Sequence, residues 1–260
     1  MHSSEAITHI SIARADSIEV RGRDLCRDLM GRLTFTEYFF LLLTGQEASE
    51  RQRYFLDLLL VAIAEHGLVP TVQAARMTLA ADPGSLQGAL AAGLLGAGPV
   101  LLGTSEACGR LLTQAHARAA AGEGDGAVAL SLVQAIRDTG GKVPGFGHPV
   151  HRALDPRTER ILALADERGV SGAHVAMARL IRDAVASVWG KPLVMNVSMP
   201  IAAVLLDLEF PAAMIKAIPL LARAGGLLAH LAEEQQSPIG FALAAHAETA
   251  VVYKKSGEGE

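Results

Sequence analysis

The chain has 260 residues, half of them apolar but only 4% aromatic, and its formal net charge is −4. This acidic balance, without a basic block, argues against nucleic acid as a partner. Alanine and leucine dominate the apolar residues, which favours helices over strands. The two cysteines, Cys26 and Cys108, form no metal-binding or redox pattern, and no histidine spacing resembles a metal site. We therefore expect a reduced, cytoplasmic protein without a metal.

Two stretches bear on targeting and membranes. Residues 1–10 contain Glu5 and no basic region followed by an apolar run, so we expect no signal peptide. Residues 83–105 carry no charge, but Pro99 and several glycines would break a spanning helix. We expect a buried helix there that ends in a loop, and no membrane as a partner.

In chain order, one brief extended piece at Ile18–Gly22 precedes helical spacing of apolar residues. Thr34 and Glu37 form a capping-box signature at the start of one helix, which Gly45 ends. The other predicted helical segments cover residues 24–30, 49–67, 70–82, 85–98, 106–121, 127–139, 155–168, 171–189, 196–208 and a stretch that opens at Pro211.

The predicted elements amount to roughly a dozen helical segments without convincing strand pairs, so the predicted class is all-α. Small residues along 85–98 permit close approach of another helix, either within the chain or from a second subunit. The tail from Ser237 to Glu260 is predicted to end in a polar, frayed terminus.

One irregular stretch, Lys142 to Arg157, interrupts the helical pattern with two glycines, with Pro144 and Pro149, and with a turn-forming Asp155-Pro156 pair. Its glycines allow positive φ and close approach of a ligand to the backbone. His148 can donate a hydrogen bond to a carbonyl oxygen near neutral pH. Arg152 and Arg157 offer forked donors suited to carboxylate or phosphate. The stretch is therefore a candidate site, with a solvated turn as the alternative.

Five pieces of the chain, in order, resemble the citrate synthase superfamily, and within it the citryl-CoA lyases more than the synthases. The matching pieces are Val20-Arg21-Gly22-Arg23-Asp24-Leu25 with Phe35-Thr36-Glu37 and Leu41-Leu42-Leu43-Thr44-Gly45, Glu65-His66-Gly67, Ala92-Gly93-Leu94-Leu95, Pro144-Gly145-Phe146-Gly147-His148 with Asp155-Pro156-Arg157, and Arg223-Ala224-Gly225-Gly226 with His230.

The resemblance implies an all-α, citrate synthase-like fold of two helical domains, with the active site in the cleft between them. The large, discontinuous domain would comprise residues 1–103 and 209–260. The small domain, residues 104–208, would carry the Gly-Phe-Gly-His loop. Domain closure would exclude water from the site. The resemblance also implies a homodimer or a larger homo-oligomer.

Residue by residue, the resemblance implies two groups of site residues. His148 would polarise or protonate the carbonyl-derived oxygen where the carbon–carbon bond forms or breaks. His66, Arg157 and Arg223 would hold the carboxylates of oxaloacetate, and several fixed cations suit a substrate with several carboxylates.

Coenzyme A, present as the acyl-CoA substrate or product, is the cofactor that the resemblance implies. Val143, Gly145, Gly147 and Arg152 would lie along it. Backbone groups would meet its adenine, and Arg152 would meet its phosphates.

The sequence departs from the family pattern at two positions. Synthases have a histidine in the first catalytic loop, and the corresponding residue here is Leu101; citryl-CoA lyases also lack that histidine. The catalytic aspartate of the family's Asn-Val-Asp is Ser198 in Asn196-Val197-Ser198. Serine has no group that titrates near neutral pH, so Ser198 cannot serve as a base without a partner.

These features predict a carbon–carbon lyase that cleaves citryl-CoA, or a similar 3-hydroxy-3-carboxy acyl-CoA, to an oxo-acid and an acyl-CoA such as oxaloacetate and acetyl-CoA. Water, Ser198 or another acid would protonate the acyl-CoA enolate. One alternative is a citrate synthase-type condensing enzyme, which is an acyltransferase. Another is a catalytically weakened relative that binds coenzyme A esters or polycarboxylates.

Each candidate residue also has an ordinary structural interpretation. His148 can be a loop histidine, and His66 can be a histidine at a helix end. Arg157 and Arg223 can serve helix caps or surface ion pairs. Three carboxylates are candidate substitutes for the missing aspartate, with solvated helix charges as the alternative: Glu106, Asp207 and Glu209.

Overall fold

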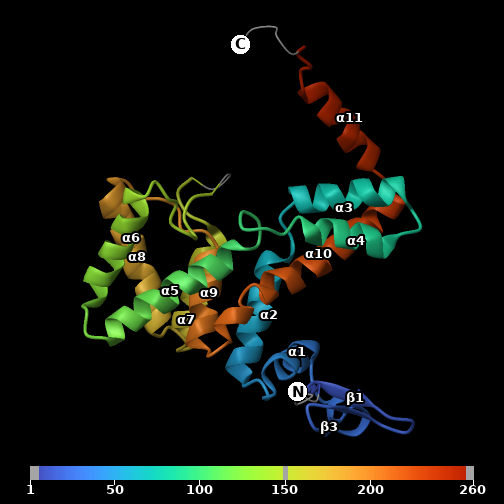
Figure 1. Cartoon of the computed structure of the whole chain (residues 1–260), viewed down its shortest axis with the longest axis horizontal. Helices are drawn as coiled ribbons and strands as arrows, with labels where there is room; N and C mark the ends of the chain where they lie inside the picture. Colours follow the sequence, from blue (N-terminus) through green and yellow to red (C-terminus); the bar gives the residue numbers. More distant parts are fainter. Residues whose placement is uncertain (1–5, 149–151, 256–260) are drawn as a thin grey trace, which may run out of the picture.

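The structure is a computed structural model, and it describes residues 6–148 and 152–255. Helices dominate it, so the predicted all-α class is confirmed (Figure 1). The helices are η1 (Leu25–Leu29, a π-helical turn), α1 (Phe35–Thr44), α2 (Glu50–Ala64), α3 (Pro70–Ala81), α4 (Leu86–Leu95), α5 (Thr104–Ala120), α6 (Asp125–Asp138), α7 (Pro156–Glu167), α8 (Ala173–Trp189), α9 (Ser198–Asp207), η2 (Ala212–Met214), α10 (Ala217–Gln236) and α11 (Gly240–Ala250).

A small antiparallel sheet at the N-terminus corrects the prediction that strand pairs are absent. Strands β1 (Ser11–Ala13), β2 (Ile18–Val20) and β3 (Arg23–Asp24) pair in chain order. Arg21 and Gly22 join β2 to β3, and both have positive φ, at 50° and 77°. A two-residue turn of this kind matches the twist of paired strands and therefore permits a tight hairpin.

The predicted capping box at the start of α1 is confirmed. The Thr34 side chain accepts from the backbone N–H of Glu37, and the Glu37 side chain accepts from that of Thr34. Ser49 and Gln52 form a second box at the start of α2. These reciprocal bonds satisfy backbone donors that a helix start leaves without partners.

The largest hydrophobic core surrounds α9, whose residues 199–205 are all buried. Helices α2, α5, α7 and α8 contact α9, and α6 packs against α5 and α8 (Figure 1). This core joins α2, from the predicted large domain, to helices of the predicted small domain. The domain division at residues 103/104 and 208/209 therefore stays a prediction.

A second core lies between α3, α4 and the later part of α10. A side chain on Gly93 of α4 would come within 3.0 Å of Leu227 and Thr71, so the small-residue face of α4 packs within the chain. In the described part of the chain, one stretch, Ala212–Gln236, is long and apolar enough to span a membrane. It includes α10, which contacts α2, α3 and α4 along its length.

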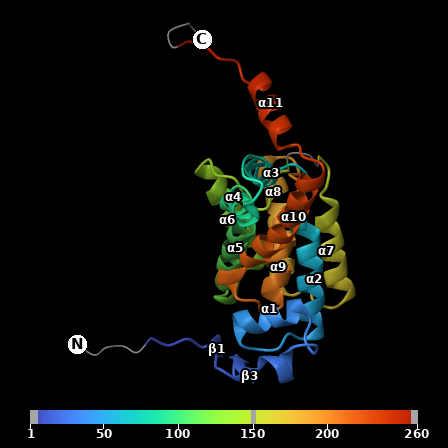
Figure 2. The ribbon, with the colours of Figure 1, turned by 90° about the vertical axis from the view of Figure 1, so that its right-hand side faces the viewer.

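The tail that follows α10 contains α11, which projects from the rest of the chain in both views (Figures 1 and 2). Only Gly240, its first residue, is buried, against Ala80 and the backbone of Arg76. No helix was predicted between residues 240 and 250, and no side chain caps the start of α11 to indicate one. The predicted fraying concerns the end of the chain, and residues 256–260 lie outside the described residues.

Candidate active site

Residues 143–148 form a loop that is fixed to the segment preceding α9. Gly145 and Gly147 both have positive φ, at 78° and 88°, which glycine adopts without strain. The N–H of Gly147 donates to the carbonyl of Val194 at 2.7 Å, and Phe146 forms an isolated antiparallel bridge with Met195. The loop that carries His148 is thus held by backbone hydrogen bonds.

Asn196 completes this attachment and was not singled out by sequence reasoning. Its backbone N–H donates to the Gly145 carbonyl at 2.8 Å, and its side-chain amide donates to the Gly147 carbonyl at 2.9 Å. Its Oδ1 accepts from the N–H of Ser198 at 3.1 Å. Asn196 therefore places Ser198, the first residue of α9, beside the glycine loop. The Asn196-Val197-Ser198 motif could have indicated this role of Asn196, but only its serine was interpreted from the sequence.

His148 lies beside Arg157, as the predicted site requires. One guanidinium nitrogen of Arg157, Nη2, is 3.5 Å from Nε2 of His148. Arg157 also donates from Nε to Oδ1 of Asp155 at 3.0 Å and from Nη2 to Oδ2 at 2.9 Å. This two-point contact fixes the plane of the guanidinium next to the imidazole.

Asp155 is a buried carboxylate that holds the side chain of Arg157 in place. It is fully buried, caps α7 by accepting from the N–H of Arg157, and accepts from the N–H of Val197 at 3.2 Å. Burial alone would raise the pKa of Asp155, but the hydrogen bonds and charge of Arg157 hold that pKa below its ordinary value. The Asp-Pro pair therefore supplies a buried carboxylate that orients Arg157.

His66 approaches the same place from the connection between α2 and α3. Its ring centroid is 5.8 Å from that of His148, with a tilt of 41°. Because two parts of the chain 82 residues apart meet here, the tertiary fold brings together three predicted residues: His66, His148 and Arg157.

Arg223, on α10, is packed beneath the connection that carries His66. It donates to Oγ1 of Thr71 at 3.2 Å and to the carbonyl of Ile63 at 3.4 Å, and it is 4% exposed. Its Nε has no hydrogen-bond partner, and no described carboxylate lies within ion-pair distance. Burial lowers the pKa of Arg223, whereas the charge of Glu65 opposes that shift. This guanidinium is a buried cation that has no carboxylate partner among the described residues.

The four residues predicted to lie along coenzyme A differ in exposure. Arg152 and Gly147 are exposed. Val143 and Gly145 are buried, so Val143 can offer only its backbone, and Gly145 faces Cys108 and Met199. The intervening Pro149-Val150-His151 of the predicted loop lies outside the described residues. Contact of all four with coenzyme A stays a prediction.

The three carboxylates considered as substitutes for the family aspartate each have other surroundings in the structure. Asp207 accepts from His174 Nδ1 at 2.9 Å and from three backbone N–H groups at the start of α8. It also ends α9, about 14 Å along the helix from Ser198. Glu106 pairs with Arg110 on the same helix, and Glu209 is an exposed residue with positive φ just beyond α9.

Known proteins resemble this chain in sequence and in fold. The family model for the C-terminal domain of citrate synthase matches residues 6–240. Putative citrate synthase 2 of Mycobacterium tuberculosis is 32% identical over 197 residues, which are 73% of this chain and 50% of that protein. The chain thus spans about half the length of this curated relative.

Two solved structures share the fold. Citryl-CoA lyase from Hydrogenobacter thermophilus aligns with a TM-score of 0.85 and 28% identity, over 98% of this chain and 96% of that one. ATP citrate lyase from Methanothrix soehngenii, solved in complex with citrate and coenzyme A, aligns with a TM-score of 0.79 and 20% identity, over 99% of this chain and 43% of that one.

The helices around α9 and the histidine–arginine site define a citrate synthase-like fold. The chain belongs to the citrate synthase superfamily, which confirms the resemblance predicted from its motifs.

Proposed function

We propose that the protein is a carbon–carbon lyase that cleaves citryl-CoA, or a similar 3-hydroxy-3-carboxy acyl-CoA, into an oxo-acid and an acyl-CoA. The observation that carries this proposal is the contact of His148 with Arg157, together with a second guanidinium, Arg223, buried beneath the connection that carries His66. Arg157 is oriented by Asp155, and Arg223 is a buried guanidinium without an anionic partner among the described residues. A buried cation is costly unless it is paired, and a substrate carboxylate would supply the missing charge.

The proposed reaction needs a base that removes the proton of the 3-hydroxyl group and an acid that protonates the acyl carbon. Removal of the 3-hydroxyl proton allows its oxygen to form the oxo-acid carbonyl while the bond to the acyl methylene breaks. The electron pair of that bond passes to the acyl-CoA enolate, whose carbon then takes up a proton. His148 is the proposed group at the hydroxyl, and Ser198, hydrogen-bonded water or another acid would deliver the second proton.

Ser198 lowers the rate expected of this site but leaves the substrate-binding residues in place. A positioned general acid or base typically contributes about 10²–10⁴-fold, so its loss slows the reaction without abolishing it. The Hydrogenobacter relative favours cleavage, whereas the Mycobacterium relative is named a citrate synthase. A condensing enzyme therefore remains the second candidate function, and a weakened binding protein is the third.

Binding of the coenzyme A part is proposed for the exposed side of the loop. Gly147 and Arg152 are exposed there, and a cavity of about 270 Å³ lies nearby, lined in part by Ala153, Leu154 and Val194. A space of this size suits one part of a coenzyme A molecule rather than the whole.

We also propose that the protein forms a homodimer or a larger homo-oligomer. Helix α11 projects from the chain, and its Phe241 is 72% exposed. An isolated helix of 11 residues is marginal in water, so packing against a second copy would stabilise it. Light scattering after size-exclusion chromatography tests this: Phe241→Glu should lower the oligomer mass, and an unchanged mass would remove α11 from the interface.

The activity is tested by incubating the protein separately with (3S)-citryl-CoA and with acetyl-CoA plus oxaloacetate, and identifying products by mass spectrometry. Production of oxaloacetate and acetyl-CoA that His148→Ala abolishes supports the lyase. Citrate or citryl-CoA formed only from the second mixture supports the condensing enzyme. No product from either mixture, together with calorimetric binding of oxaloacetate or coenzyme A, supports the binding protein.

A further inference from the structure

One face of α10 carries an arginine and a histidine, and the carboxylate of Glu65 lies against this face. Arg223, Gly226 and His230 follow at spacings of three and four residues, so they share one side of the helix. Glu65 lies on this side: a side-chain carbon built on Gly226 would be 3.6 Å from Oε2 of Glu65. Glu65 contacts His230, and its charge also acts on Arg223.

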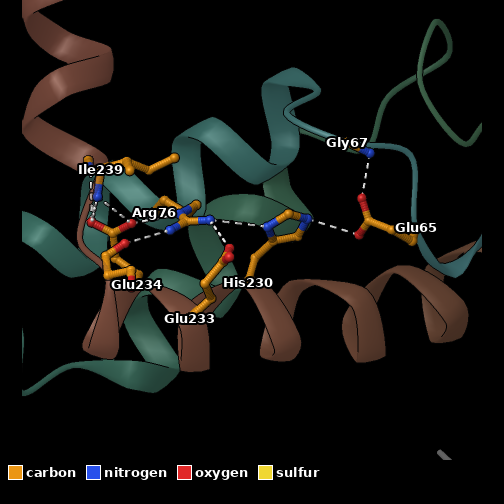
Figure 3. A network of polar contacts seen from close by, with 9 residues as sticks. Glu65, Gly67, Arg76, His230, Glu233, Glu234 and Ile239 are labelled. Carbon is orange, nitrogen blue, oxygen red and sulfur yellow. Dashed lines mark hydrogen bonds and ion pairs between the residues drawn. The ribbon is translucent and has the colours of Figure 1, made fainter.

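Glu65 is paired with His230. Its Oε2 accepts from Nε2 of His230 at 2.9 Å, and its Oε1 accepts from the backbone N–H of Gly67 (Figure 3). Burial alone would raise the pKa of Glu65, but these hydrogen bonds hold that pKa below its ordinary value. Glu65 is thus a carboxylate at neutral pH, and both its oxygens are used.

A buried ion cluster fixes the orientation of His230. Nδ1 of His230 is 3.5 Å from Nη1 of Arg76, and a guanidinium can only donate, so Nδ1 accepts and Nε2 carries the proton. Arg76 is 2% exposed and is held by Glu234 at 2.6 Å and Glu233 at 2.5 Å (Figure 3). The imidazole therefore presents its N–H to Glu65 from a fixed position.

Without this contact, Glu65 has an alternative partner. The side chain of Glu65 is 54% exposed, so it has room to change rotamer. Among the residues that the structure describes, Nε of Arg223 has no hydrogen-bond partner and no carboxylate forms an ion pair with this guanidinium. A carboxylate that reached it would form a two-point ion pair and neutralise the cation.

We propose that His230 is a positioning residue that holds the Glu65 carboxylate away from Arg223 and so keeps this guanidinium open to a carboxylate of the substrate. The inference rests on the proposed function, in which Arg223 binds the oxo-acid. In this inference, Glu65 would compete with the substrate carboxylate for Arg223 if His230 did not hold it.

The test is a pair of linked substitutions read by oxaloacetate binding in isothermal titration calorimetry. His230→Leu should weaken binding by at least about tenfold, because oxaloacetate must then displace Glu65 from Arg223. Adding Glu65→Gln to His230→Leu should restore the affinity to within about threefold, since a neutral amide does not quench the cation. His230→Gln can still donate to Glu65 and accept from Arg76, so it should bind like the wild type.

A second readout needs no substrate. Arg223→Met should lower the urea unfolding midpoint more in His230→Leu than in the wild type, because only the former contains a Glu65–Arg223 ion pair to lose. If wild-type protein binds no oxaloacetate, the proposed function fails, and the unfolding comparison still decides this inference. Equal midpoint changes in both backgrounds would overturn it, and so would failure of Glu65→Gln to restore binding in a protein that binds oxaloacetate.

Discussion

Replacing Asp155 separates its charge from its role as a helix cap. The carboxylate receives two hydrogen bonds from the Arg157 guanidinium, and it also accepts from the N–H groups of Arg157 and Val197. Asp155→Asn keeps an oxygen that can cap α7 but removes the negative charge. Asp155→Ala removes the cap, the charge and the acceptor together. The two variants therefore measure different parts of one contact.

The magnitudes follow from these contacts. A hydrogen bond to a charged group contributes about 1.5–3 kcal/mol and a neutral one about 0.5–1.5 kcal/mol, so losing the charge from two bonds costs about 2 kcal/mol. Asp155→Ala adds the loss of a cap, about 1 kcal/mol, and leaves buried N–H donors without an acceptor, at about 1–3 kcal/mol. We expect total losses of about 2 kcal/mol for Asp155→Asn and about 4–6 kcal/mol for Asp155→Ala.

Urea unfolding at pH 7, followed by circular dichroism, measures both losses. Because the folded pKa of Asp155 is lowered, its charge stabilises the fold fully above the unfolded pKa of about 3.9. This contribution is lost as the pH falls below that value toward the folded pKa. The difference in unfolding free energy between wild type and Asp155→Asn should therefore shrink between pH 5 and pH 3. A difference that is absent at pH 7, or constant over this range, would refute the argument.

Three further predictions concern the proposed chemistry. His148→Ala should lower turnover of citryl-CoA by at least about 10²-fold, measured by release of oxaloacetate, while unchanged turnover would remove His148 from the site. Arg157→Lys and Arg223→Lys should each raise KM for the acid substrate, since lysine cannot make the two-point contact; an equal KM in steady-state assays would count against carboxylate binding. Ser198→Asp should increase deuterium exchange of the acetyl-CoA methyl or speed cleavage, and no change in either would show that this position does not face the acyl carbon.

Local signals in the sequence predicted the elements that depend on neighbouring residues. The capping box of Thr34 and Glu37 predicted the start of α1 because both partners lie within four residues. The hairpin at Arg21-Gly22 was missed because its strands are only two or three residues long and show no alternating pattern. Helix α11 was missed because it begins at a glycine without a side-chain cap.

The site was predictable in its residue types but not in its supporting contacts. His148 and Arg157 lie nine residues apart around an Asp-Pro turn, so one loop could be expected to bring them together. Arg76 and Glu234 pair across 158 residues, and neither stands in a recognisable motif. Only the packing of α3 against α10 brings them together. Such contacts depend on tertiary structure, and the local periodicity of the sequence does not predict them.

The departure from the family pattern at Ser198 concerns one half of the proposed substrate. Ser198 replaces a group that, by resemblance, moves a proton on the acyl methyl, while His66, Arg157 and Arg223 would hold the oxo-acid. A catalytic group lowers one barrier for both directions, so the loss at Ser198 affects the rate rather than the choice between cleavage and condensation. Binding of the oxo-acid should therefore be better preserved than chemistry at the acyl carbon. Because the two halves of the substrate can be supplied separately, the affinity for oxaloacetate without coenzyme A measures binding by Arg157 and Arg223 independently of turnover.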